Sequence, residues 1–341
     1  MKAIRYHGPN EPLRLEEVSR PEPGRGEVLV RIRAAGIWHT ELHFLSGLLN
    51  LGVAPLTLGH EIVGTVESVG PDVEAAREGD RVIVYYYVGC GRCAQCRRGE
   101  ENLCGNLRAE YGFVSDGGLA EFVTVSARNA VPLPSHIRDE EAAPIGCAVT
   151  TAIHAGRLAD LGPGDVALVY GVGAVGYGLI QLGRLVGTTV IAVGRTDAKL
   201  ERAKELGAHY VVNAQRESVV DRIRELTDGR GADAVFELVA TRQTMDHSVQ
   251  SLAKRGRLVF IGYSADAFTV HPIQLVVNEA RVMGSVGNTL DELYEAVRWV
   301  SQGKIRTVVD RTLGLEGFQE GIDALAAGRP IGRVVLTPSA R

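Results

Sequence analysis

Four of the five cysteines lie close together in the chain with the spacing C-x2-C-x2-C-x7-C: Cys90, Cys93, Cys96 and Cys104. Short spacings of this kind let turns direct several thiolates to one point, and four thiolates form a closed tetrahedral zinc site. Because a closed shell leaves no open coordination position, the pattern predicts a structural zinc. Four unrelated thiols and an iron–sulfur cluster are the alternatives, but this spacing within a loop of a β-rich region favours zinc.

A glycine-rich turn of the form G-x-G-x-x-G is the second pattern with a clear chemical use: Gly171, Val172, Gly173, Ala174, Val175 and Gly176. The apolar run 166–170 precedes it as a predicted strand, and a helical pattern follows it. In this context the glycines let the backbone approach a pyrophosphate, which lies at the N-terminus of the helix. A glycine-rich packing turn is the alternative, but the strand–turn–helix order favours a dinucleotide site.

The residues after the next apolar run bear on the choice of coenzyme: Gly194, Arg195 and Thr196. An NAD-specific site would place Asp or Glu there, to accept hydrogen bonds from the ribose hydroxyls. Gly194 leaves no such carboxylate, Arg195 can form charge-assisted bonds to a 2′-phosphate, and Thr196 adds a hydroxyl. Lys199 either assists or is a solvated helix lysine. The pattern favours NADP(H) over NAD(H).

The composition is typical of a globular protein of about two domains. The chain has 341 residues, of which 45% are hydrophobic and 23% are charged, and 37 basic against 41 acidic residues give a net charge of −4. This balance provides no basic surface for nucleic acid on bulk grounds. The sequence contains no membrane-spanning run and no apolar leader at its start, so we expect a cytoplasmic protein that binds a small-molecule substrate.

The elements that must position these patterns change character near Pro144. Residues 1–150 contain short β-like runs (28–32, 62–69, 81–88 and 120–125), which predict an irregular β-rich domain. Between residues 151 and 287, apolar strands alternate with helical patterns, which predicts a doubly wound parallel sheet. After Gly287 come a helix over 291–301 and strand-like pieces. We expect this segment, 288–341, to fold back onto the first domain.

Three further segments complete the pattern: Gly36-Ile37-Trp38-His39-Thr40-Glu41-Leu42-His43, Gly59-His60-Glu61-Ile62-Val63-Gly64 and Gly146-Cys147-Ala148-Val149-Thr150-Thr151. Together with the glycine turn and the segment that holds the four cysteines, residues 90–104 (the cysteine lobe), they resemble the medium-chain dehydrogenase/reductase superfamily, specifically its zinc-containing alcohol dehydrogenase branch. The resemblance extends over essentially the whole chain. The resemblance implies an α/β protein with a GroES-like catalytic domain, an inserted Rossmann domain and an active site in the cleft between them. It also implies a homodimer or homotetramer, joined partly through the strand near residues 282–286.

The resemblance also assigns roles to individual positions of this sequence. His60 and Cys147 match ligands of a catalytic zinc, and Glu61 matches a neighbouring carboxylate that can enter the zinc shell. The positions that match a proton relay are Thr40 and His43, and Glu41 matches an acidic position beside the ligands, with Glu for the usual Asp. The positions that match contacts to the coenzyme are His39, Thr151 and Arg333.

Trp38 departs from the family pattern, because it stands where the first cysteine ligand of the catalytic zinc is expected. Indole has one N–H donor and no usable lone pair, so it cannot bind zinc, and it is far larger than a cysteine side chain. Either the catalytic zinc is lost or weak, or it persists through His60, Cys147 and Glu61. The first alternative is favoured, because two strong ligands seldom hold zinc in an open site. A natural change and an engineered substitution would both give this pattern.

The leading functional prediction is reversible hydride transfer between NADP(H) and an alcohol or carbonyl substrate, at an impaired zinc site. Without zinc, polarisation of a simple carbonyl is weak. A zinc-independent NADPH reductase of activated C=C bonds, such as those of enals or enones, is therefore the first alternative. A non-catalytic NADPH-binding protein is the second alternative.

Overall fold

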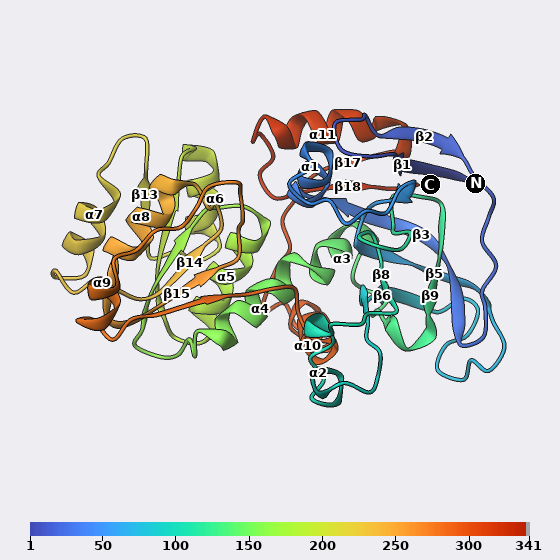
Figure 1. Ribbon diagram of the computed structural model, residues 1–341, viewed down its shortest axis with the longest axis horizontal. Helices are drawn as coiled ribbons and strands as arrows, with labels where there is room; N and C mark the ends of the chain where they lie inside the picture. The colour runs from blue at the N-terminus through green and yellow to red at the C-terminus, as the bar shows by residue number, and fades with distance from the viewer. Residues whose placement is uncertain (339–341) are drawn as a thin grey trace. The chain divides into compact units, whose positions relative to one another are not determined.

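The computed structural model describes residues 1–338, and the chain forms two compact units (Figure 1). The first unit contains Met1–Thr150, Asn288–Gly303 and the residues from Thr307 onward. The second contains Thr151–Gly287 and, in addition, Lys304–Arg306. These three residues were predicted to lie with the first domain. They group with the second because the Gln181 side chain bonds both the N–H and the C=O of Arg306.

The first unit is rich in short strands. They are β1 (Lys2–Tyr6), β2 (Arg14–Glu17), β3 (Glu27–Ile37), β4 (Leu56–Thr57), β5 (Glu61–Val69), β6 (Arg81–Val84), β7 (Tyr87–Val88), β8 (Ala109–Glu110), β9 (Phe122–Ser126), β10 (Ala130–Pro132), β17 (Val309–Leu313) and β18 (Arg333–Leu336). Its helices are α1 (His39–Ser46), α2 (Ala94–Arg97), η1 (Glu101–Leu103), η2 (Ala127–Asn129), α3 (Asp139–Ala142), η3 (Ala143–Gly146), α10 (Leu290–Ser301), η4 (Leu315–Gly317) and α11 (Phe318–Ala326).

The main sheet of this unit has seven strands, in the order β10-β6-β5-β3-β18-β17, with β9 also paired to β3. β3 is central, and its side chains Val28, Val30 and Ile32 are fully buried. β18, near the end of the chain, pairs antiparallel with β3. The C-terminal segment therefore belongs to the β-rich unit by direct strand pairing.

The predicted strand 81–88 is in fact two strands in different sheets. β6 ends at Val84 and pairs with β5 and β10, whereas β7 pairs with β8. The break occurs because the backbone of Tyr85 bonds to Asn129 instead of a strand, and the Asn129 amide holds the carbonyls of Tyr85 and Tyr87. Apolar residues on both sides hid this bend from a pattern based on hydrophobicity.

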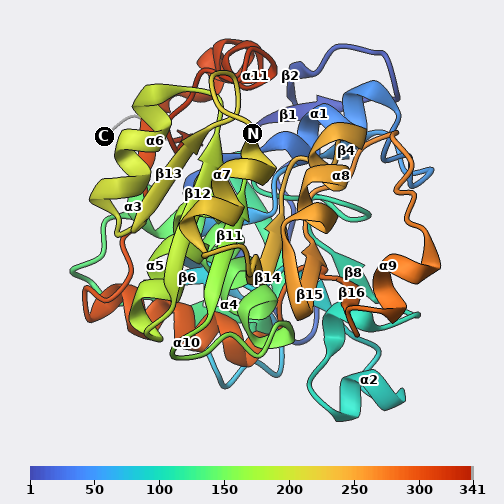
Figure 2. The same cartoon turned by 90° about the vertical axis from the view of Figure 1, so that its left-hand side faces the viewer.

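The second unit is a parallel sheet with strands β11 (Val166–Tyr170), β12 (Thr189–Gly194), β13 (Tyr210–Asn213), β14 (Ala232–Glu237), β15 (Leu252–Phe260) and β16 (Arg281–Gly284). Its helices are α4 (Ala148–Leu158), which begins in the first unit, α5 (Ala174–Leu185), α6 (Asp197–Glu205), α7 (Val219–Leu226), α8 (Arg242–Gln250) and α9 (Pro272–Val276). Figure 2 shows the strand order β13-β12-β11-β14-β15-β16.

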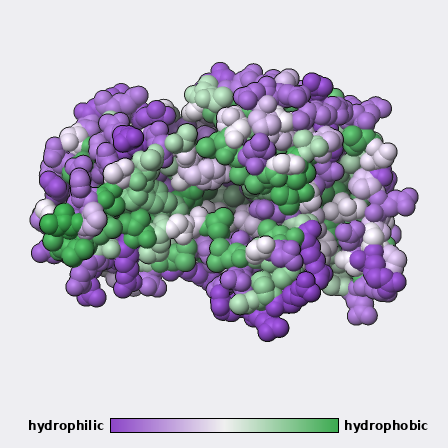
Figure 3. All heavy atoms as spheres, in the orientation of Figure 1, coloured by the Kyte–Doolittle hydropathy of each residue, from purple (hydrophilic) through white to green (hydrophobic). Residues whose placement is uncertain are grey.

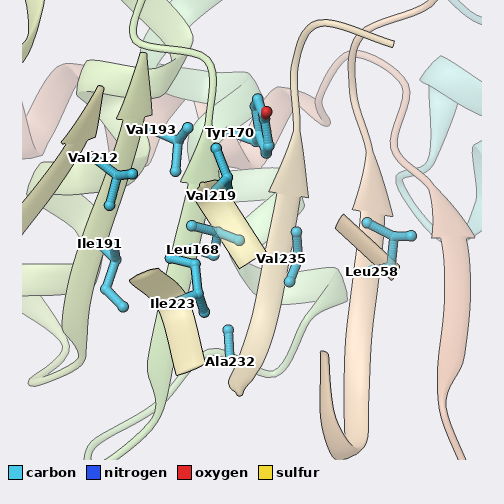
Figure 4. Close-up of a cluster of buried hydrophobic side chains, with 10 residues drawn as sticks. All are labelled: Leu168, Tyr170, Ile191, Val193, Val212, Val219, Ile223, Ala232, Val235 and Leu258. Carbon is cyan, nitrogen blue, oxygen red and sulfur yellow. The ribbon is translucent and has the colours of Figure 1, made fainter. Parts of the chain in front are cut away.

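The core of the second unit lies between this sheet and helix α7 (Figure 4). Leu168, Ile191 and Val235 point from neighbouring strands toward Val219 and Ile223 of α7, and all five are buried. Parallel strands joined by helices on both faces form the doubly wound fold. The predicted combination of a β-rich domain with a parallel-sheet domain is confirmed. No helix among residues 1–338 is long and apolar enough to cross a membrane.

Candidate functional site

The strand register at the end of β3 brings distant parts of the sequence together. Gly36 pairs with Glu61 of β5, and Ile37 pairs with Val334 of β18. The register therefore places Trp38, just after β3, beside Arg333, at the start of β18. Gly36 has no side chain, and a Cβ there would collide with the Glu61 carboxylate. The glycine thus leaves the space that the carboxylate occupies.

Trp38 stacks on the guanidinium of Arg333, which in turn is paired with Glu61; these three residues are called the stack below. The Arg333 guanidinium carbon lies 3.8 Å from the centroid of the Trp38 ring, and Nη2 of Arg333 donates to Oε1 of Glu61 at 2.6 Å. The side chains of Arg333 and Glu61 are both 0% exposed. A desolvated cation over an indole face is stabilised by about 2 kcal/mol. The Trp38 ring therefore covers the buried ion pair, and it has no lone pair with which to bind a metal.

Two buried carboxyl groups lie at this place: Glu61 within the stack and Glu41 beside it. The N–H of Trp38, at the start of α1, donates to Oε2 of Glu41 at 2.7 Å, and Glu41 is 1% exposed. Burial raises the pKa of Glu41 to about 7, against the hydrogen bond from the Trp38 backbone. Burial also raises the pKa of Glu61 to about 7, although the Arg333 charge opposes the rise.

His60 lies in an aromatic environment that the sequence patterns did not predict. Its ring centroid is 5.1 Å from that of Tyr86 and 4.9 Å from that of Phe113. The ring is buried, and its Nδ1 has no hydrogen-bond partner. Burial, aided by the Arg333 charge, lowers the pKa of His60 to about 3, so the imidazole is neutral. The run of three tyrosines, 85–87, is the sequence signal that could have indicated this aromatic surrounding.

The four-cysteine lobe fits a tetrahedral zinc site. All four sulfurs lie within 4.8 Å of one another, and the Cys90–Cys96 and Cys93–Cys104 pairs are each 3.9 Å apart. Sulfurs bound about 2.3 Å from one tetrahedral zinc would be about 3.8 Å apart. The backbone N–H groups of Cys90 and Asn106 also point to the Cys104 sulfur at 3.4 Å, which suits a thiolate.

The residues at the matched catalytic position do not fit a second zinc. Trp38 supplies no lone pair, and Arg333 holds one oxygen of Glu61, Oε1, whereas Oε2 has no hydrogen-bond partner. Within residues 1–338, the cysteine lobe is the one place where three or more His, Cys, Asp or Glu ligand atoms converge at metal-binding distances. His60, Cys147 and Glu61 do not form such a group in this conformation.

The other residues matched to the catalytic site lie on α1 or next to α4. Thr40 is buried in α1, and His43 is half-buried one turn later on the same helix. Burial lowers the pKa of His43. His39 is exposed at the start of α1. Cys147 is buried just before α4, and its carbonyl accepts a hydrogen bond from Thr150.

The glycine turn has the geometry that a pyrophosphate site requires. Gly171 follows β11 with a φ of 116°, which favours glycine, and Gly173 precedes the first turn of α5. A Cβ on Gly176 would meet the Gly171 carbonyl, so the helix can start this close to the strand because Gly176 has no side chain. A helix N-terminus after a glycine turn of this kind is where dinucleotide-binding folds hold a pyrophosphate. Thr151 lies in the same unit, on α4.

The end of β12 presents a cation where a carboxylate would favour NAD. Gly194 ends the strand, and Arg195 and Thr196 are exposed before α6. Arg195 has no ion-pair partner in the described part of the chain. The nearest acidic residue in sequence, Asp197, is occupied by Asn213 at 2.7 Å and Arg216 at 2.8 Å. Lys199 is half-buried on α6, and its carbonyl accepts from Tyr177.

Known proteins resemble both parts of the chain. Residues 24–135 match the alcohol dehydrogenase GroES-like domain family, and residues 174–302 match the zinc-binding dehydrogenase family. A NAD-dependent alcohol dehydrogenase of Sulfurisphaera tokodaii is 36% identical over 348 residues, which cover 99% of this chain and 100% of the relative. An acryloyl-coenzyme A reductase of the same organism is 31% identical over 344 residues, covering 99% of this chain and 100% of the relative. A crystal structure of an alcohol dehydrogenase from Aeropyrum pernix has a TM-score of 0.93 and 37% identity, covering 99% of this chain and 100% of that chain.

Proposed function

This chain belongs to the zinc-type alcohol dehydrogenase family of the medium-chain dehydrogenases, and from that premise we propose an NADP(H)-dependent oxidoreductase whose catalytic zinc site is impaired. The family membership makes it an oxidoreductase of alcohols and carbonyls that uses a nicotinamide coenzyme. The β-rich unit would carry the substrate chemistry, and the parallel-sheet unit would bind the dinucleotide. The observation that carries the impairment is the stack of Trp38 on Arg333, with Arg333 paired to Glu61.

The stack affects two positions that could supply a metal ligand. Trp38 replaces a thiolate with a ring that cannot bind zinc, and Arg333 pairs with Oε1 of Glu61, the carboxylate that could compensate. His60 and Cys147 then remain, and two ligands seldom hold zinc in an open site. The buried Arg333 charge further opposes a second cation at this place.

The proton path proposed for this site lies on α1. Thr40 and His43 are three residues apart on one helix, so their side chains are neighbours on its surface. The lowered pKa of His43 keeps its imidazole neutral near pH 7, as a proton acceptor must be. In alcohol oxidation the hydride would pass to the nicotinamide, and the hydroxyl proton would pass through Thr40 to His43. Reduction of a carbonyl would reverse both transfers.

Reduction of activated C=C bonds is a second candidate, because one relative is named an acryloyl-coenzyme A reductase. The nicotinamide hydride would add to the β-carbon of an enal, enone or thioester, and a proton would then add to the α-carbon. Delocalisation into the enolate stabilises the developing charge, so this reaction depends less on a metal than carbonyl reduction does.

Two measurements on the same preparation test the proposal. Elemental analysis should give about one zinc per chain, bound by the cysteine lobe. About two zincs would contradict the impairment of the second site. A panel of saturated aldehydes and matched enals, with NADPH and NADH in turn, identifies the reaction. Reduction confined to C=O would exclude the C=C reductase, and tight NADPH binding without turnover would indicate a non-catalytic binding protein.

The proposed preference for NADP(H) rests on Arg195 and not on the relatives. The relative from Sulfurisphaera tokodaii is named NAD-dependent. A guanidinium without an ion-pair partner within residues 1–338 suits the 2′-phosphate that distinguishes NADP(H). The absence of an acidic residue at 194–196 removes the repulsion that such a phosphate would meet.

A homo-oligomer is also proposed, joined through the second unit. β16 is an edge strand of the parallel sheet, so one side of its backbone is open to further pairing. Helix α9, a few residues earlier, exposes Ile273 at 67% and Val276 at 72%, and Val277, directly after it, is 62% exposed. Figure 3 shows the hydrophobic surface over this helix. An apolar patch next to an open strand edge is typical of a subunit interface.

A further inference from the structure

Glu237, the last residue of β14, is a buried carboxylate that the dinucleotide motif does not explain. Its side chain is 0% exposed, and its Oε2 accepts the backbone N–H of Val239 at 3.1 Å and that of Ala240 at 2.6 Å. The other oxygen, Oε1, has no hydrogen-bond partner. Burial raises the pKa of the carboxyl, and the Thr244 side chain and these backbone bonds oppose part of the rise. The carboxylate thus folds back on the loop that follows its own strand.

That loop, residues 238–241, lies between two glycine positions at the carboxyl end of the sheet. A Cβ on Gly171 would lie 3.0 Å from the Leu238 Cβ and 3.1 Å from a Val239 methyl. On the other side, a Cβ on Gly262 would collide with the Leu238 backbone. In open α/β sheets, dinucleotides bind outside this end of the strands. The loop therefore forms a wall directly beside the first glycine of the coenzyme turn.

The loop needs to be held in its conformation. Ala240 has a φ of 60°, in the left-handed region that costs a non-glycine residue about 1 kcal/mol. Its carbonyl accepts from the Ser264 hydroxyl at 2.5 Å, and its N–H donates to Oε2 of Glu237 at 2.6 Å. Without the Glu237 side chain, two backbone N–H groups would lose their acceptor, and the loop would relax away from Gly171.

We propose that Glu237 is a positioning residue for the nicotinamide coenzyme: it fixes loop 238–241 against the glycine turn and so sets the affinity for NAD(P)(H). Glu237 itself touches no coenzyme atom in this scheme. Val239, which is 37% exposed, is the side chain that the loop presents beside Gly171. The inference rests on dinucleotide binding by the proposed function, but it does not depend on which substrate is reduced or whether zinc binds.

Three variants test the inference by direct binding, measured as NADPH fluorescence, with thermal unfolding as the check on folding. Glu237→Ala should weaken NADPH binding about ten-fold, as expected for the loss of buried hydrogen bonds that position a binding loop. Where turnover is measurable, KM for NADPH should rise while kcat changes little. Glu237→Gln should bind within about two-fold of the parent chain, because both bonds go to one oxygen and the Gln carbonyl can accept them.

Asn129→Ala is the matched control, because Asn129 is buried and holds two backbone carbonyls of the other unit. It should lower the unfolding temperature without weakening NADPH binding. Parent-like binding by folded Glu237→Ala would overturn the proposal, as would a Gln variant as weak as the Ala variant. If Asn129→Ala weakens NADPH binding as much as Glu237→Ala does, the effect is general destabilisation. That result would also overturn the proposal. If the parent chain binds NADPH but reduces no substrate, the proposed oxidoreductase activity is contradicted. The binding comparison of the Glu237 variants still tests the role of Glu237.

Discussion

At the scale of single residues, the proposed loss of the catalytic zinc depends on Trp38. In the proposed assignment Trp38 stands where the family pattern has a cysteine ligand, and its ring lies over the Arg333 guanidinium. The consequence is electrostatic as well as steric, because a thiolate would have added a negative charge beside Arg333 and the indole adds none. Under the proposed assignment, the buried Arg333 charge opposes a metal cation at this place.

Trp38→Cys should raise zinc from about one to about two per chain and raise kcat/KM for alcohol oxidation by at least about a hundred-fold. Polarisation by a metal supplies several kcal/mol in the transition state, and each 1.36 kcal/mol is a factor of ten. Trp38→Ser is the matched control, because it removes the ring without supplying a thiolate. If Trp38→Cys gains neither zinc nor activity, the missing ligand is not what limits the site.

Arg195 carries the expected preference for NADP(H). Arg195→Ala should raise KM for NADPH about five- to ten-fold and leave KM for NADH unchanged, because only NADPH carries the 2′-phosphate; an exposed charge-assisted bond contributes about 1 kcal/mol. Arg202→Ala is the control, since Arg202 is an exposed arginine of α6 already paired with Glu205 at 2.7 Å. Equal losses with both coenzymes would contradict a role in phosphate recognition.

At the scale of elements, the cysteine lobe has little packing of its own, so the expected zinc would hold it together. The lobe consists of turns, the short helix α2 and η1, and its residues Gly91, Arg97 and Leu103 are exposed. A segment with so little buried apolar surface needs a cross-link to remain ordered, and a structural zinc contributes its binding free energy to folding.

Cys96→Ser should therefore reduce zinc from about one per chain to near zero and lower the unfolding temperature by several degrees, as expected for a structural site. Cys147→Ser, which changes the cysteine outside the lobe, should retain the zinc. Elemental analysis and thermal unfolding of both variants check this. Retention of zinc by Cys96→Ser would show that the metal is bound elsewhere.

Strand register is the element-scale feature that assembles the candidate site. Glu61 and Arg333 are far apart in the sequence, yet both lie beside the end of β3 because β5 and β18 pair with it on opposite sides. A register shift of one residue would turn Arg333 to the opposite face of the sheet. The site thus depends on a central strand that is buried along most of its length.

At the scale of the whole molecule, buried carboxyl groups give stability a pH dependence. Burial raises the pKa of Glu110 from its ordinary 4.5 to about 7. Between these values the unfolded chain loses a proton that the folded chain keeps, so this group makes stability fall as pH rises from about 4.5 to about 7. Glu110→Gln should flatten that part of the profile, as chemical denaturation at several pH values would measure. An unchanged slope would mean that Glu110 does not contribute.

The proposed oligomer is the other property of the whole molecule. Val276→Asp should shift the assembly toward a smaller species in light scattering after gel filtration, because it places a charge in an apolar contact. Val114→Asp, at an exposed apolar residue of the first unit, is the control and should not change the mass. A monomeric parent chain, or a Val276→Asp variant of unchanged mass, would contradict an interface at α9.

The sequence by itself determined the local motifs and the fold class. The spacing of Cys90 to Cys104 and the turn at Gly171 are short-range patterns, and the alternation of strands and helices is periodic, so both are visible without tertiary structure. The sequence also identified Trp38 as a residue that cannot bind zinc, because that property belongs to indole itself.

Only the tertiary structure decided what Trp38 does instead. Its ring lies on Arg333, an arrangement that no sequence spacing reveals, and His60 contacts Tyr86 and Phe113, for which the tyrosine run 85–87 is only a partial signal. The bend after β6 was likewise hidden, since residues on both sides are apolar. The buried bonds of Glu237 belong to the same class. Long-range contacts follow from strand register and burial, which are set by the packing of the whole chain and not by its local composition.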